Sequence, residues 1–232
     1  SELSIESALK VSKYVRVDQI KQIPFLEFFH TIPLLSYVRF AKWEEILSYK
    51  KPIDEFKFSL GLYHYARSIA FASTGDVISA ISEQEKILPL KDADEIKVII
   101  KAGQPSDKLL EISHFLALGQ IELARNNYLK AIDYFSVAVD IQDALPYREP
   151  EFWYYPTRQS LGHALMLNKN FEEAVKVFNK DLENYPRNGW SFYGLHKAHQ
   201  SLENKNQSQD ALDKFKEIWQ FSDVELQSSV IY

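Results

Sequence analysis

The 232-residue chain contains no cysteine and only one methionine, Met166. Without cysteine, disulfide bonds, thiol catalysis and zinc sites with cysteine ligands are excluded, whereas the cellular compartment (cytoplasm, periplasm or outside the cell) stays open. Glycine is scarce too, with 7 residues where a share of about 7% is usual. A glycine-rich phosphate-binding loop is therefore not expected.

The chain also lacks a basic excess and a long apolar run. Its 27 basic and 32 acidic side chains give a formal net charge of −5, so nucleic acid is not an expected partner. The run 32–40 is interrupted by Pro33, Ser36 and Arg39, so we expect no membrane span. The first residues, Ser-Glu-Leu, carry neither an initiator methionine nor a signal-peptide pattern. We expect the chain to be processed or, as the repeats described below favour, to be a piece of a longer protein.

Aromatic residues are abundant, and the apolar residues follow a helical period. In 171–185 the apolar side chains recur three or four positions apart, with charged side chains between them. The same pattern is present in 128–141 and 211–221, and no alternating segments flank a hairpin turn. The sequence therefore predicts an all-α fold.

A small residue followed four positions later by an aromatic one recurs along the chain. Twelve residues before each small residue, another compact residue falls in the preceding predicted helix. Two helices cross closely only where small side chains meet, and the aromatic ring then fills the space between successive hairpins. Clear copies are Gly119 with Ala131 and Phe135, Gly162 with Ala174 and Phe178, and His199 with Ala211 and Phe215; Ser68 with Ala80 is weaker, and a degenerate copy surrounds Trp43 and Ile46.

These copies resemble the tetratricopeptide repeat family, whose unit is a helical hairpin of about 34 residues. The match is good where Leu118-Gly119 and Leu161-Gly162 precede the alanine–phenylalanine pairs, and Pro186 also falls in place. The resemblance implies a right-handed α-solenoid of about five hairpins with two inter-repeat insertions. We expect an N-terminal helix (1–22), a degenerate repeat (23–53), a weak repeat (54–88), an insertion (89–105), repeats at 106–143, 144–186 and 187–223, and a tail (224–232).

A narrower resemblance joins the chain to the C-terminal region of long bacterial tetratricopeptide proteins of undefined molecular role. It rests on Arg39-Phe40-x2-Trp43, on the aromatic run in 149–156 and on Asn188-Gly189-Trp190. It implies that the N-terminal helix, about 3–17, stacks on further repeats upstream.

The first helix of each hairpin lines the concave surface of such a solenoid. Most of the positions expected to face this groove are polar or aromatic, which suits a protein or peptide ligand. None is lysine or asparagine, the residues with which the best-known tetratricopeptide clamps hold a C-terminal carboxylate, so we do not expect that ligand. The alternative is that several of them only pack against the neighbouring hairpin. The positions are Tyr65, Ile69, Leu116, Gln120, Gln159, His163, His196 and Gln200.

The segment 147–158 combines five aromatic residues with two arginines and fixed prolines. Trp153, Tyr154, Tyr155 and Arg158 form either a rigid platform for stacking and cation–π contacts or a plug that fills the solenoid at the second insertion. The sequence leaves both interpretations open.

No catalytic, metal or cofactor motif is present. His196 and His199 have a spacing that metal ligands can adopt, but the chain has no HExxH or GxSxG pattern. We therefore expect a non-catalytic scaffold that binds a protein or peptide. The alternatives are a structural assembly module that forms homo-oligomers through its ends, and an enzyme with a pocket near 147–158 and His163 as base.

Overall fold

The computed structural model describes residues 1–230, so of the predicted tail only 231–232 lie outside the described part. Every regular element in this range is helical, which confirms the all-α prediction, and no helix there is long and apolar enough to cross a membrane. The helices are α1 (Glu2–Tyr14), α2 (Val17–Gln22), η1 (Pro24–Leu26), α3 (Glu27–Arg39), α4 (Trp43–Ser48), α5 (Lys57–Ser73), α6 (Val77–Gln84), η2 (Leu88–Asp92), α7 (Asp94–Lys101), α8 (Ser106–Ala124), α9 (Tyr128–Asp143), α10 (Arg158–Leu167), α11 (Phe171–Asn184), α12 (Gly189–Ser201) and α13 (Lys205–Trp219).

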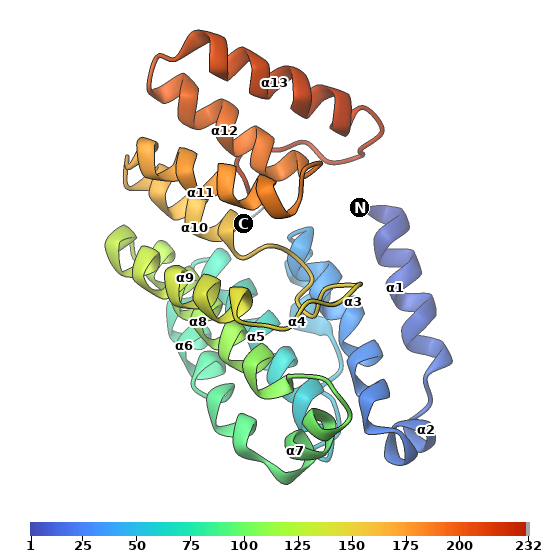
Figure 1. Cartoon of the computed structure of the whole chain (residues 1–232). Coiled ribbons are helices and arrows are strands. Elements are labelled where there is room, and N and C mark those ends of the chain that lie inside the picture. Colours follow the sequence, from blue (N-terminus) through green and yellow to red (C-terminus); the bar gives the residue numbers. More distant parts are fainter. Residues whose placement is uncertain (231–232) are drawn as a thin grey trace.

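Ten of the helices pair as consecutive antiparallel neighbours: α3 with α4, α5 with α6, α8 with α9, α10 with α11, and α12 with α13. Each pair also contacts the next one, through α3–α5, α5–α8, α9–α10 and α11–α12. Figure 1 shows α5–α9 in the lower part of the molecule and α10–α13 in the upper part, with α1 beside α3. Contacts therefore run mainly between neighbours in the sequence.

Close helix crossings form at the glycines that the sequence pattern singled out. A Cβ atom on Gly119 would lie 2.3 Å from Cε1 of Phe135, and one on Gly162 would lie 2.3 Å from Cε1 of Phe178. Ser68 and Ala80 meet in the same way, with the Ser68 hydroxyl donating to the Ala80 carbonyl at 2.9 Å. The predicted crossings at these positions are confirmed.

The N-terminal region differs from the single helix expected over 1–22. α1 ends at Tyr14, and α2 begins at Val17. His30 Nε2 donates a hydrogen bond of 2.6 Å to the Val15 carbonyl, and Val15 itself is extended. Because the Val15 carbonyl is bonded to His30 and not within a helix, the helix is interrupted at Val15. The periodicity of residues 1–22 does not reveal this contact.

The insertion 89–105 is also more than a connection. It contains the end of η2 and all of α7, whose Ile96 and Ile99 side chains are fully buried. The alternation of these isoleucines with Lys97 and Lys101 gives α7 one apolar face, and that face packs against α8. The insertion therefore adds to the core.

Candidate functional site

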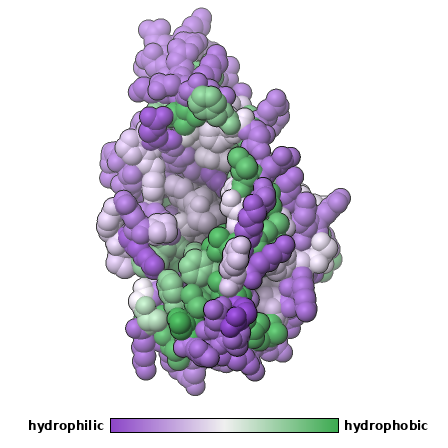
Figure 2. Space-filling view, turned by 90° about the vertical axis from the view of Figure 1, so that its right-hand side faces the viewer, coloured by the Kyte–Doolittle hydropathy of each residue, from purple (hydrophilic) through white to green (hydrophobic). Residues whose placement is uncertain are grey.

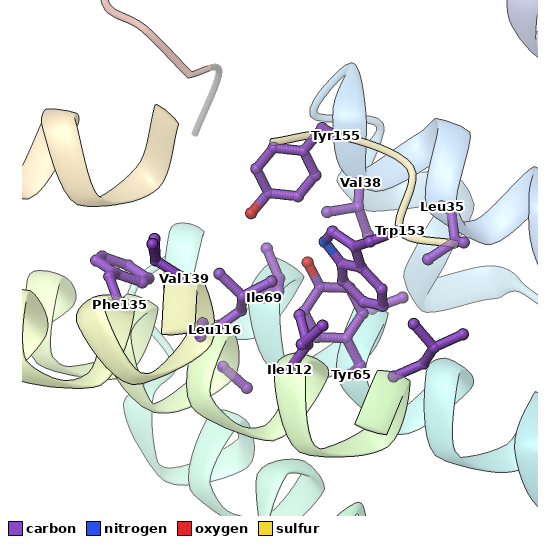
Figure 3. Packing of buried hydrophobic residues seen from close by; sticks show 14 of the residues in the cluster. Leu35, Val38, Tyr65, Ile69, Ile112, Leu116, Phe135, Val139, Trp153 and Tyr155 are labelled. Carbon is purple, nitrogen blue, oxygen red and sulfur yellow. The ribbon is translucent and has the colours of Figure 1, made fainter. Parts of the chain in front are cut away.

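The aromatic segment between α9 and α10 packs onto α3 and α5. The Trp153 ring meets the Tyr65 ring edge-on with centroids 5.6 Å apart, and the Tyr65 and Tyr154 hydroxyls are 2.9 Å apart. Figure 3 shows Trp153 between the α3 side chains Leu35 and Val38 and the α5 side chain Tyr65. Trp153 is only 3% exposed and Tyr155 only 6%, so these rings belong to the core and favour the plug interpretation.

Two residues of α9 hold the end of this segment. Gln142 Oε1 accepts hydrogen bonds of 2.7 Å from both the amide and the hydroxyl of Thr157. Arg158 donates two hydrogen bonds to the Asp143 carboxylate, one of them at 2.6 Å. This bidentate pair occupies the guanidinium that the sequence suggested for a ligand platform.

Arg39, the last residue of α3, connects the aromatic segment to α12. Its guanidinium carbon lies 3.8 Å from the centre of the Trp190 ring and 5.1 Å from that of Tyr155. Cation–π contacts of this kind add stability when the ring and the cation are partly removed from water. Arg39 therefore marks the place where α3, the aromatic segment and α12 meet.

Beside this point lies a cavity of about 650 Å³, which we call the tyrosine cavity. Gln159 is 1% exposed and lines the cavity, and among the described residues its Oε1 atom has no hydrogen-bond partner. The lining is rich in aromatic and amide side chains and contains two arginines. It consists of Arg39, Tyr154, Tyr155, Pro156, Gln159, Asn184, Tyr185, Pro186, Arg187 and Asn188.

Asp181 lies behind the wall of the tyrosine cavity and holds the lining residue Asn188 in place. Its Oδ2 atom accepts hydrogen bonds from Ser191 Oγ at 2.5 Å and from Asn188 Nδ2 at 2.7 Å. Burial raises the pKa of the Asp181 carboxyl to about 6, although these hydrogen bonds oppose the shift. The contact fixes Asn188, whose side chain also caps the N-terminus of α12.

A second cavity of about 350 Å³, which we call the tail cavity, lies between α10, α12 and residues 227–229. Burial lowers the pKa of the His163 imidazole to about 4, so the ring is uncharged at neutral pH. The cavity is lined by His163, Met166, Leu167, Phe178, Gly194, Lys197, Gln200, Ser201, Gln227, Ser228 and Ser229.

The predicted groove residues separate into two groups. Gln159 lines the tyrosine cavity, together with Tyr154 and Tyr155 of the aromatic segment, while His163 and Gln200 line the tail cavity. The others are held within the helical packing: Tyr65, Ile69 and Leu116 are each 1% exposed, Gln120 Nε2 donates to Ser73 Oγ, and His196 Nδ1 contacts Ser208 Oγ.

The enzyme alternative requires His163 and the 147–158 segment to share a pocket. A cavity of about 620 Å³ does lie beside that segment, lined among others by Tyr147, Glu151 and Arg158. His163 is not part of its lining and faces the tail cavity instead. Within residues 1–230, no three histidine, aspartate or glutamate side chains group as metal ligands.

Several lining residues were not foreseen as site residues. Arg39 and Asn188 stood in the motifs that carry the bacterial resemblance, and this is the one signal that pointed to them. Tyr185, Arg187 and the 227–229 segment carried no such signal. Comparison of the chain with family models, with curated proteins and with solved structures finds no match in any of the three.

Proposed function

We propose that the chain is a tetratricopeptide-like, right-handed α-solenoid that binds a segment of a partner protein without catalysing a reaction. The stacking of five helical hairpins and the repeated glycine–phenylalanine crossings support this architecture. The binding surface runs from the tyrosine cavity, at the start of α10 and the α11–α12 connection, to the tail cavity between α10 and α12.

The observation that carries the proposal is the Gln159 Oε1 atom, which has no hydrogen-bond partner among residues 1–230 and belongs to a side chain in the wall of the tyrosine cavity. A buried amide oxygen without a partner is costly, and in this proposal the Gln159 side chain turns toward the cavity to accept from a peptide N–H group. Around it, the rings of Tyr154 and Tyr185 offer apolar contact area, and Arg187 and Asn188 offer hydrogen-bond donors. This mixture is typical of sites that hold an extended peptide segment.

A random peptide display library, selected on the immobilised full chain, tests the proposal. We expect enriched peptides whose affinity falls about tenfold in Tyr185→Ala, since truncating an aromatic anchor costs at least about 1.4 kcal/mol. Ile78→Ala is the matched control, because Ile78 is 84% exposed on α6, away from both cavities. The proposal is wrong if no peptide is enriched, or if enriched peptides bind Tyr185→Ala as tightly as the wild type.

The exposed face of α1 favours a second candidate function, assembly through the end of the solenoid. Leu3 and Tyr14 are 79% and 83% exposed there, whereas the outer face of α13 is mainly polar. Figure 2 looks onto the side of the molecule on which α1 lies and shows apolar residues gathered over the lower half of that face. If this function holds, sedimentation shows concentration-dependent association that Leu3→Glu abolishes. A wild-type chain that stays monomeric at high concentration contradicts it.

A further inference from the structure

After α13 the chain turns back and crosses the inner side of α10 and α12. Figure 1 shows this return from α13 toward the middle of the molecule, next to α10. Ser229 Oγ donates a hydrogen bond of 3.0 Å to the Gln159 carbonyl, 70 positions away in the sequence. Leu226 and Val230 are 9% and 4% exposed, whereas Glu225 and Gln227, on either side of Leu226, face solvent.

This segment, 224–230, therefore sits as a short peptide would sit in a groove. Leu226, Ser229 and Val230 are buried, the Ser229 hydroxyl donates to a helix carbonyl, and the two residues beside Leu226 are exposed. It forms one wall of the tail cavity, opposite the predicted groove residues His163 and Gln200. The start of the segment is held by one further contact, from Trp219 Nε1 to the Val224 carbonyl at 2.6 Å.

We propose that residues 224–230 are a built-in ligand that occupies the α10–α12 groove and must leave before a partner segment binds there. This inference rests on the proposed function and adds its regulation and the chemistry of its ligand. The partner segment is an extended, uncharged stretch with a serine or threonine next to an aliphatic residue. The hydroxyl donates to the Gln159 carbonyl as Ser229 does, and the aliphatic side chain takes the place of Val230.

The contacts of the segment suit reversible release. No ion pair links 224–230 to the helices among the described residues, and Ser229 Oγ makes the one side-chain hydrogen bond from the segment to α10. A groove that is open in only a fraction of molecules shows an affinity reduced by that fraction. Opening the segment by substitution therefore strengthens binding of a peptide supplied from outside.

The test uses the full chain and a fluorescent peptide of residues 222–230 as probe. In the released variant, Leu226→Asp/Val230→Asp, charges at the two buried positions expel the segment from its apolar contacts. The matched control, Gln220→Asp/Ser222→Asp, adds the same charge at two exposed positions that lie outside 224–230 and outside both cavity linings. We expect fluorescence polarisation to show the probe binding the released variant at least about tenfold more tightly than the wild type or the control.

Equal affinity for all three chains overturns the inference, and so does a folded released variant that does not bind the probe.

Hydrogen exchange of the wild type tests the inference without any substitution. Amides of 224–230 should exchange at least about tenfold faster than those of α10 and α12, because a releasable segment opens without global unfolding; equal protection overturns the inference. If library peptides bind wild type and released variant equally well, this inference alone fails, whereas the proposed function fails only if neither chain enriches a peptide.

Discussion

The ring of Phe178 occupies the space that side chains on Gly162 and Gly194 would need. A Cβ atom would lie 2.3 Å from Phe178 Cε1 if built on Gly162, and 2.4 Å from Phe178 Cζ if built on Gly194. The ring thus joins α11 to α10 within its own hairpin and to α12 in the next. Because Phe178 and Gly194 both line the tail cavity, the shape of that cavity depends on this contact.

Gly162→Ala should destabilise the chain by about 1–3 kcal/mol, because the added methyl forces the packed ring out of position. Urea unfolding measures the change. In Gly162→Ala/Phe178→Leu the smaller side chain makes room for the methyl, so the two effects should be less than additive. Fully additive costs would contradict the contact.

Glu27→Gln tests a buried carboxylate at the start of α3, which accepts a hydrogen bond from the first turn of α5. Glu27 is 3% exposed, and its Oε1 atom accepts from the Ser59 amide at 2.6 Å. Burial raises the pKa of Glu27 to about 7, although the hydrogen bonds from α5 oppose the shift. The folded state therefore holds the proton more tightly than the unfolded state, and this stability is lost as the pH rises from about 4.5 through 7.

In Glu27→Gln the acceptor oxygen remains and the charge is removed, so this loss, of about 2–3 kcal/mol, should disappear from the pH dependence of unfolding. Glu55→Gln, at an exposed neighbouring acid, is the control and should retain it. An unchanged pH profile in Glu27→Gln would count against the assignment.

The pKa of Glu83 is shifted in the opposite direction to that of Glu27. Its carboxylate accepts from His64 Nδ1 at 2.6 Å and from Arg67 Nε at 3.2 Å, joining α5 to α6. Burial alone would raise the pKa of Glu83, but these hydrogen bonds outweigh it and lower the pKa to about 2. Its contribution is therefore present above about pH 4.5 and is lost as the pH falls toward 2.

Glu83→Gln should cost about 3 kcal/mol at neutral pH, because it leaves the partly buried Arg67 without its counter-charge. The difference from the wild type should shrink on acidification below pH 4.5 in thermal unfolding experiments. Glu85→Gln, at an exposed position nearby, should change little. A constant difference between pH 7 and pH 3 would show that the ion pair is not its source.

Trp153→Ala separates the two interpretations of the aromatic segment. Because Trp153 is 3% exposed and packs on Tyr65, the substitution should cost about 3–5 kcal/mol of stability. Tyr147→Ala, at a ring 83% exposed, should leave stability nearly unchanged. A folded, equally stable Trp153→Ala chain that has lost peptide binding would instead support a surface platform.

The helices and their crossings were predictable because their signal is local. The twelve-residue spacing between Gly162 and Ala174 lies within one hairpin, so the positions that meet repeat along the sequence. The break after Tyr14 was not predictable, since it depends on the hydrogen bond from His30 to Val15 in the fold.

The candidate site was harder to predict, because it is formed by contacts between residues that are far apart in the sequence. Tyr65 and Tyr154 meet across 89 residues, and Gln159 and Ser229 across 70, with no periodic pattern to announce either contact. The register of α10 identified Gln159 and His163 as inner-face residues. It did not indicate that other segments of the chain cover Tyr65 or form one wall of the tail cavity.

The central claim is that a partner segment lies on the inner side of α10 and α12, and photo-crosslinking tests it most directly. A library-selected peptide carrying a photoreactive group is bound to the full chain, irradiated, and its attachment points are found by mass spectrometry. Attachment is predicted within 154–167, 184–188 and 194–201, which line the two cavities. Attachment mainly to α6, α9 or the outer face of α13 would contradict the claim.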